Sequence, residues 1–266
     1  KNVLPIVFGP ALANYMSKVL PALGVKGVAP KTYQKWVSGL RRNVLPELPY
    51  QYSESTPMDV IEIKRHPLWL TYYKEEIKKR SQNFRNLFIK KLSNIEQIEL
   101  VIKAWDTLND FPLIPRLLNL ISWSKDDYSI ESIERLSSLR IKKRLQNVLE
   151  KSFPELFESP HLLISQIWND CLVNKELLNS TVNRLAPGEF KDSQISSVWT
   201  WAVRQYQNRQ VRKDIIDIEN ETFDPQKNLM DNRVDSITNE KALLDEEDDS
   251  LLLILYQLAM GPLKRK

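Results

Sequence analysis

The fold class of this chain is decided by residues 68–108, LWLTYYKEEIKKRSQNFRNLFIKKLSNIEQIELVIKAWDTL. Apolar side chains recur along this stretch in steps of three, four or seven residues, among them Phe88 and Trp105. Such spacing places them on one face of an α-helix. The stretch is longer than a typical globular helix, so we expect either an antiparallel coiled-coil arm or a break near Ser93 and Asn94.

Most of the remaining chain has the same helical character. The 266 residues include only six glycines, which disfavours a fold with many tight β-turns. Apolar periodicity and capping residues predict further helices at about 11–20, 32–42, 116–123, 130–149, 160–168, 177–185, 193–206 and 248–260. Short strands are expected at 3–8, 25–29 and 60–63. We therefore predict a mainly α protein with a small α/β part.

The α/β part begins at residues 3–25, VLPIVFGPALANYMSKVLPALGV, with a short strand, a Gly9-Pro10 turn and a helix. That order opens a unit of a parallel sheet, although few other strands follow. The sequence contains neither G-x-x-x-x-G-K-[ST] nor G-x-G-x-x-G, so the turn is not expected to bind a nucleotide. Because residue 1 is Lys and the strand lacks neighbours, we expect a fragment of a longer protein.

Several function classes are disfavoured by composition. Cys171 is the only cysteine, and His66 and His161 are the only histidines. These counts exclude an intramolecular disulfide and disfavour cysteine- or histidine-based metal centres. The longest apolar run, Leu251 to Leu255, is too short to cross a bilayer. We expect a cytoplasmic protein with no membrane partner.

Charge is distributed unevenly along the chain, although the formal net charge is only +4. Segments 64–91 and 135–151 are basic, whereas segment 214–249 is acidic. Solvated helix faces are the ordinary explanation of such runs, and contact with nucleic acid or another acidic surface is the functional one. For the acids at 245–249 we expect a solubilising role in a linker and a favourable interaction with the following helix dipole, not a metal cluster.

Aromatic residues offer one candidate contact outside the core. Thr32 is a good helix N-cap and Tyr33 follows it. Because a helix N-terminus binds phosphate readily, Thr32 could contact a phosphate while Tyr33 stacks on a base. Five tryptophans lie within apolar periodicity and are expected to pack in the core: residues 69, 105, 168, 199 and 201.

Three stretches resemble UvrD/Rep-type superfamily-one DNA helicases, especially the HelD-like branch. They are VFGPALANYMSKVLPALGVKGVAPKTYQKW at 7–36, IKRHPLWL at 63–70 and LDEEDDSLLLILYQLAMGPLKRK at 244–266. The sequence departs from the family at Ala11, where an asparagine is usual. By resemblance, Phe8–Pro10 would be motif Ia and Thr32-Tyr33 motif Ib, which grip single-stranded DNA in the family.

The resemblance also implies a division of the chain. Residues 1–46 would be a remnant of the first RecA-like domain, 47–206 a helical accessory insertion of the 1B type, 207–240 an acidic mobile linker, and 241–266 a helix returning to the RecA-like core. The Walker A and Walker B motifs would lie outside the chain. ATP and Mg²⁺ would therefore belong to the parent protein, an ATP hydrolase, and no catalytic residue, metal ligand or cofactor is expected in this fragment.

We therefore expect an accessory-domain fragment of an ATP-dependent DNA helicase, which binds single-stranded or duplex DNA and supports unwinding and translocation without hydrolysing ATP itself. One alternative is a HelD-like arm that docks on RNA polymerase through the acids at 245–249 and recycles the polymerase. Another is a helical protein-interaction scaffold. The expected DNA contacts are Phe8, Gly9, Pro10, Thr32, Tyr33, Lys64, Arg65, Lys78, Lys79, Arg80, Arg140, Lys142, Lys143 and Arg144.

Overall fold

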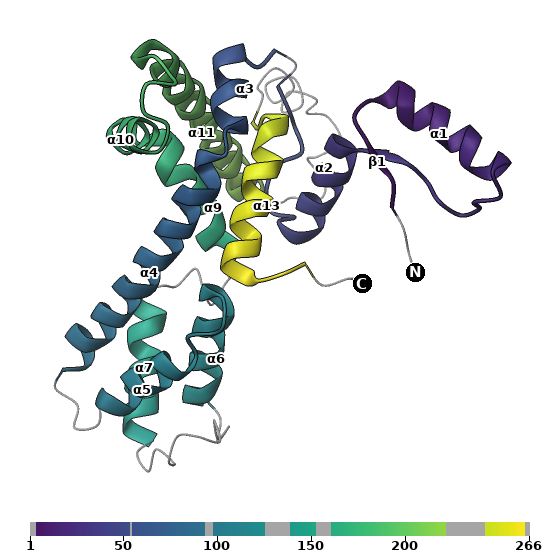
Figure 1. Ribbon diagram of the computed structural model, residues 1–266. Helices are drawn as coiled ribbons and strands as arrows, with labels where there is room; N and C mark the ends of the chain where they lie inside the picture. The colour runs from purple at the N-terminus through teal and green to yellow at the C-terminus, as the bar shows by residue number, and fades with distance from the viewer. Residues whose placement is uncertain are drawn as a thin grey trace. The chain divides into compact units, whose positions relative to one another are not determined.

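The computed structural model describes residues 4–53, 55–93, 98–125, 139–152, 161–221 and 243–263 (Figure 1). Over these residues the chain forms eleven helices and one sheet of two strands, which confirms the mainly α prediction. The chain divides into two compact units. Unit 1 comprises residues 1–65 and 196–253, and unit 2 comprises residues 66–195 and 254–266.

Unit 1 begins with a strand, a helix and a second strand. These are β1 (Ile6–Val7), α1 (Pro10–Ala22) and β2 (Lys31–Thr32), followed by α2 (Tyr33–Val44). The two strands are parallel, with Ile6 opposite Lys31 and Val7 opposite Thr32. The predicted strand, turn and helix are thus confirmed.

The second strand was predicted at 25–29, and this position is wrong. Gly24 and Gly27 take φ values of +80° and +76°, which turn the chain and prevent a continuous extended segment there. The extended residues that pair with β1 come only after Pro30, at Lys31 and Thr32.

We expect the β1–α1–β2 segment to exchange its amide hydrogens quickly. Each strand has two residues and α1 buries none of its side chains, so opening this segment exposes little apolar surface. In hydrogen–deuterium exchange, peptides over residues 4–32 should exchange at least about a hundredfold faster than peptides over residues 175–185. Equal protection of the two regions would contradict this expectation.

The rest of unit 1 contains α3 (Met58–Arg65), the later part of α11 (Asp192–Glu221) and the first part of α13 (Glu246–Met260). The edge strand predicted at 60–63 is wrong, because these residues lie in α3. Val60 and Ile63 are both fully buried, and their three-residue separation suits one helix face.

The acidic linker predicted at 207–240 is also wrong in its first part, because α11 continues to Glu221. Residues 222–240 lie outside the described residues. Where the chain is described again, Leu244 pairs with Tyr52 in an isolated parallel bridge.

Unit 2 is built from six helices and the end of α13. They are α4 (Leu68–Leu92), α5 (Ile98–Thr107), α6 (Leu113–Lys125), α7 (Leu139–Ser152), α9 (His161–Val173) and α10 (Lys175–Leu185). In Figure 1, α5, α6 and α7 gather beside the C-terminal half of α4. The expected break near Ser93 is confirmed, since α4 ends at Leu92.

The core of unit 2 is rich in aromatic side chains. Trp69, Trp105 and Trp168 are at most 1% exposed, as predicted, whereas Trp199 and Trp201 of α11 are half-buried. Phe88 packs edge-on against Trp105, with ring centroids 5.4 Å apart. Cys171 is a buried free cysteine, and burial raises the pKa of its thiol to about 12.

Candidate functional site

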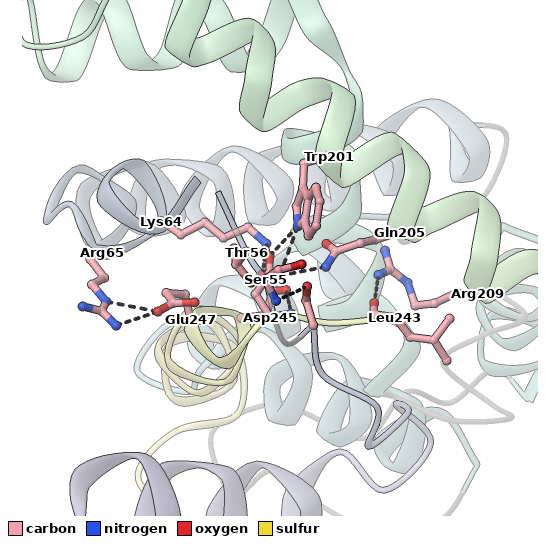
Figure 2. A network of polar contacts seen from close by, with 12 residues as sticks. Ser55, Thr56, Lys64, Arg65, Trp201, Gln205, Arg209, Leu243, Asp245 and Glu247 are labelled. Carbon is pink, nitrogen blue, oxygen red and sulfur yellow. Dashed lines mark hydrogen bonds and ion pairs between the residues drawn. The ribbon is translucent and has the colours of Figure 1, made fainter. Parts of the chain in front are cut away.

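The acidic run at 245–249 lies at the start of α13 and forms the centre of a buried polar cluster in unit 1 (Figure 2). Asp245 is fully buried and accepts hydrogen bonds from Lys64 Nζ at 2.5 Å and Thr56 Oγ1 at 2.8 Å. Trp201 Nε1 and Gln205 Nε2 of α11 each donate to it at 3.0 Å. The carboxylate of Asp245, the residue just before α13, therefore bonds to side chains of α3 and α11.

Lys64 contacts a second buried carboxylate. Its Nζ lies 2.7 Å from Oδ1 of Asp248, whose Oδ2 accepts a hydrogen bond from the Asp245 amide at 2.8 Å. Burial by itself would lower the pKa of Lys64, but the carboxylates of Asp248 and Asp245 outweigh it and raise that pKa. We call Lys64, Asp245 and Asp248 the Lys64 cluster; its lysine is charged at neutral pH.

Lys64 does not fit its expected role as a DNA contact. The residue is only 2% exposed, and its ammonium group is held by two carboxylates. Its neighbour Arg65 differs, because the Arg65 side chain is 68% exposed even though its Nη2 pairs with Glu247 at 2.7 Å. Of these two expected contacts, only Arg65 presents its side chain to solvent.

The solubilising role expected for the acids at 245–249 is wrong. Asp245, Glu247, Asp248 and Asp249 are buried, and Glu246 alone is exposed. The acids do lie at the N-terminal end of α13, where the helix dipole favours negative charge. Because the buried carboxylates are already paired with cations, they lend no support to docking on a basic channel of RNA polymerase.

A second buried ion pair in unit 1 joins α2 to α13. Arg41 is fully buried and donates from Nε to Asp249 Oδ1 at 2.7 Å. Its other nitrogens donate to the carbonyls of Leu48 and Pro49 and to the Tyr52 hydroxyl, which donates in turn to Asp249 Oδ2 at 2.9 Å. We call Arg41, Tyr52 and Asp249 the Arg41 cluster.

The two clusters were not foreseen, although the sequence carried a signal for each. Arg41 is four residues after Val37 and four before Leu45, so it occupies the apolar face of α2. Lys64 likewise follows Val60 by four residues on α3. A charged residue at such a position indicates a buried ion pair. Both clusters are satisfied internally, so their role is structural.

The two segments that resemble helicase motifs, Phe8–Pro10 and Thr32-Tyr33, lie at the ends of β1 and β2. Because Val7 lies opposite Thr32, the next residues of each strand, Phe8 and Tyr33, leave the sheet at the same edge. Phe8 is completely exposed and Tyr33 is 48% exposed. The structure thus brings the strand ends before Phe8 and Tyr33, which are 25 residues apart in the sequence, to one edge of the sheet.

Polar groups accompany these aromatic rings. Thr32 is the N-cap of α2, as predicted, and its Oγ1 accepts a hydrogen bond from the Lys35 amide at 3.2 Å, which leaves its hydroxyl hydrogen as a donor. At the start of α1, Gly9 is the N-cap and Pro10 lies at the first helical position, with no side-chain capping bond. The amides of Ala11 and Leu12 therefore lack an acceptor within the helix.

The remaining expected contacts are basic residues of unit 2. Lys78 and Lys79 of α4 are exposed, and so is Lys143 of α7. Arg80 is mostly buried and is engaged by Glu76 and Asp170, each at 2.9 Å. The side chains of the other three expected contacts lie outside the described part of the structure: Arg140, Lys142 and Arg144.

Comparisons with protein-family models, curated proteins and solved structures found no match to this chain. The helicase resemblance therefore stands on the three sequence stretches alone. Within the described residues, no helix has the length and apolar character needed to cross a membrane. In that same part of the chain, no three His, Cys, Asp or Glu side chains gather so that they could hold a metal ion.

Proposed function

We propose that this chain is an accessory part of a UvrD/Rep-like, ATP-dependent DNA helicase and that it binds the backbone of single-stranded DNA through the edge where β1 and β2 end. The observation that carries the proposal is the parallel register of the two strands, with Val7 opposite Thr32, so that Phe8 and Tyr33 follow at the same end of the strand pair. Two exposed aromatic rings at one sheet edge can stack on successive bases.

The groups next to these rings suit a phosphate. The free amides of Ala11 and Leu12 at the start of α1 point along the helix axis, where the dipole attracts an anion. The hydroxyl of Thr32 can donate to the same backbone. Since these contacts are to sugar and phosphate and not to base edges, binding would be independent of sequence and sensitive to salt, as a translocating motor requires.

Fluorescence anisotropy with a labelled oligothymidine at low and moderate salt tests this proposal. Phe8→Ala and Tyr33→Ala should each weaken binding by about tenfold or more, because a stacked base contributes about 1–3 kcal/mol. Tyr15→Ala is the matched control, since Tyr15 is 63% exposed on α1 but does not lie at the strand ends. Its affinity should stay within about twofold of the parent chain.

Two results would count against the proposal: no binding even at low salt, or equal losses in the Tyr15→Ala and Tyr33→Ala variants. The helicase assignment is tested separately, by the sequence that the gene encodes on either side of this chain. A G-x-x-x-x-G-K-[ST] motif encoded upstream and a D-E-x-Q-D motif encoded downstream would support it. If the flanking sequence lacks both motifs, the helicase assignment fails while DNA binding can still hold.

A further inference from the structure

A pocket of about 630 Å³ lies between α4, α5 and α6 in unit 2. Cations outnumber anions among the charged side chains that line it: Lys78, Lys79, Arg85 and Arg116 against Glu75 and Asp106. Three of the four cations come from α4, and the fourth comes from α6. The excess of cations already favours an anionic ligand.

Arg116 is the most unusual member of this wall. It is only 5% exposed, and its guanidinium lies over the Trp105 ring, 3.9 Å from the ring centroid. Its hydrogen bonds go to neutral oxygens: the Trp105 carbonyl at 2.6 Å, Ser81 Oγ at 3.0 Å and Asn109 Oδ1 at 3.1 Å. Among the described residues, no carboxylate forms an ion pair with Arg116.

Burial lowers the pKa of Arg116, and the more distant Asp106 only partly opposes this effect. A guanidinium nevertheless remains protonated at neutral pH. A buried cation without an ion-pair partner is costly in a protein interior, and an anion bound in the pocket would remove that cost.

The two acids of the pocket are already paired with arginines. Glu75 accepts from Arg184 at 2.6 and 3.1 Å, and Asp106 accepts two hydrogen bonds from Arg85 at 3.1 Å each. Lys78, by contrast, is exposed and has no ion-pair partner among the described residues. Lys78 is therefore the cation that is most available to a ligand.

The neutral groups of the pocket also act mainly as donors. Because Ser81 Oγ and Asn109 Oδ1 accept from Arg116, the Ser81 hydroxyl hydrogen and the Asn109 amide group remain to donate. Gln82 is the exception, since its Nε2 donates to Asn86 and its carbonyl oxygen stays an acceptor. Donors from α4, from α6 and from Asn109 between α5 and α6 suit a group with several anionic oxygens.

We propose that this pocket binds a phosphate group, carried either by a free nucleotide or by a nucleic-acid backbone, with Lys78 and Arg116 as its principal cations. The site lies in unit 2 and uses none of the residues at the ends of β1 and β2. The proposal therefore does not depend on DNA binding by Phe8 and Tyr33.

Titrations of the isotope-labelled chain followed by NMR test this site, with dTMP, thymidine and a short oligothymidine at constant ionic strength. dTMP should shift the signals of Ser81, Trp105 and Asn109 in a saturable manner, whereas thymidine, which has no phosphate, should not. If only the oligonucleotide shifts them, the site takes a backbone phosphate and not a free nucleotide. Phe8→Ala should leave the dTMP response unchanged, which keeps this test separate from that of the proposed function.

Three variants make the test specific. Lys78→Glu should weaken binding by about tenfold, whereas Lys90→Glu, an exposed lysine on the same helix outside the pocket, should change it by less than about twofold. Asp106→Asn should strengthen binding severalfold, a gain that damage to the fold could not produce. The proposal is overturned if no phosphate-bearing probe shifts the pocket signals, if the two lysine variants behave alike, or if Asp106→Asn weakens binding.

Discussion

Replacing Lys64 by methionine is expected to lower the free energy of unfolding by about 3–5 kcal/mol. The substitution keeps much of the side-chain volume but leaves the carboxylates of Asp245 and Asp248 buried without their cation. The largest cost falls on Oδ1 of Asp248. This oxygen has no hydrogen-bond partner among the described residues apart from its ion pair with Lys64. Urea denaturation followed by circular dichroism measures the loss, and hydrogen exchange over α3 and α13 assigns it to unit 1.

Lys35→Met is the matched control, since Lys35 is an exposed lysine on α2. Its unfolding free energy should change by no more than about 0.5 kcal/mol. A loss below about 1 kcal/mol in Lys64→Met would show that the two carboxylates do not depend on Lys64.

The effect of Lys64→Met should also depend on pH. Burial raises the pKa of Asp248 even beside Lys64, and removal of Lys64 raises this pKa further. The folded variant then binds a proton more readily than the unfolded chain, in which aspartate has a pKa of about 3.9. Its stability is therefore lost as pH rises through the raised pKa. The difference in unfolding free energy between Lys64→Met and the parent chain should become smaller from pH 7 toward about pH 4. A difference that grows over this range would contradict this account.

Replacing Arg41 by lysine is expected to lower the free energy of unfolding by about 3 kcal/mol, although the charge is conserved. A lysine can still pair with Asp249, but it cannot also reach the Leu48 and Pro49 carbonyls and the Tyr52 hydroxyl, which are held by the spread nitrogens of the guanidinium. Each buried acceptor left without a donor costs about 1–3 kcal/mol. The same urea denaturation measures this loss.

Arg42→Lys provides the comparison for Arg41→Lys on the next residue of α2. Arg42 is exposed and its guanidinium lies 5.1 Å from the centre of the Tyr50 ring. Loss of that contact should cost at most about 1 kcal/mol. If both variants lose the same stability, the fork of hydrogen bonds from Arg41 is not what holds the cluster together.

Local patterns predicted the helices well because each pattern is complete within a short stretch. The apolar pattern at 68–108 is too long for one typical helix, which predicts the break after Leu92, and Thr32 marks the start of α2. The second strand was predicted at the wrong position because the apolar residues at 25–29 favour a strand there. Its actual position depends on where Gly24 and Gly27 turn the chain.

The buried clusters could be foreseen only in part. The position of Arg41 on an apolar helix face indicates that its guanidinium pairs with a buried acid. The sequence does not show which acid, because Asp249 lies 208 residues away. Acids before an apolar helix are usually solvated, and a single sequence has no signal that joins them to a distant lysine or arginine. The phosphate pocket is similar, because Arg116 becomes an unpaired cation only when α6 packs beside Trp105.

The separation of 181 residues between Lys64 and Asp245 has a consequence for biosynthesis. A ribosome adds about 5–20 residues per second, so the first 65 residues emerge on the order of ten seconds before the carboxylates that complete their interior. Residues 66–195, most of unit 2, form a continuous segment, so the contacts among them can form in that interval, before residues 254–266 are made. Unit 1 must wait for the last quarter of the chain, and its uncovered apolar side chains make it the part of a nascent chain that most needs a chaperone.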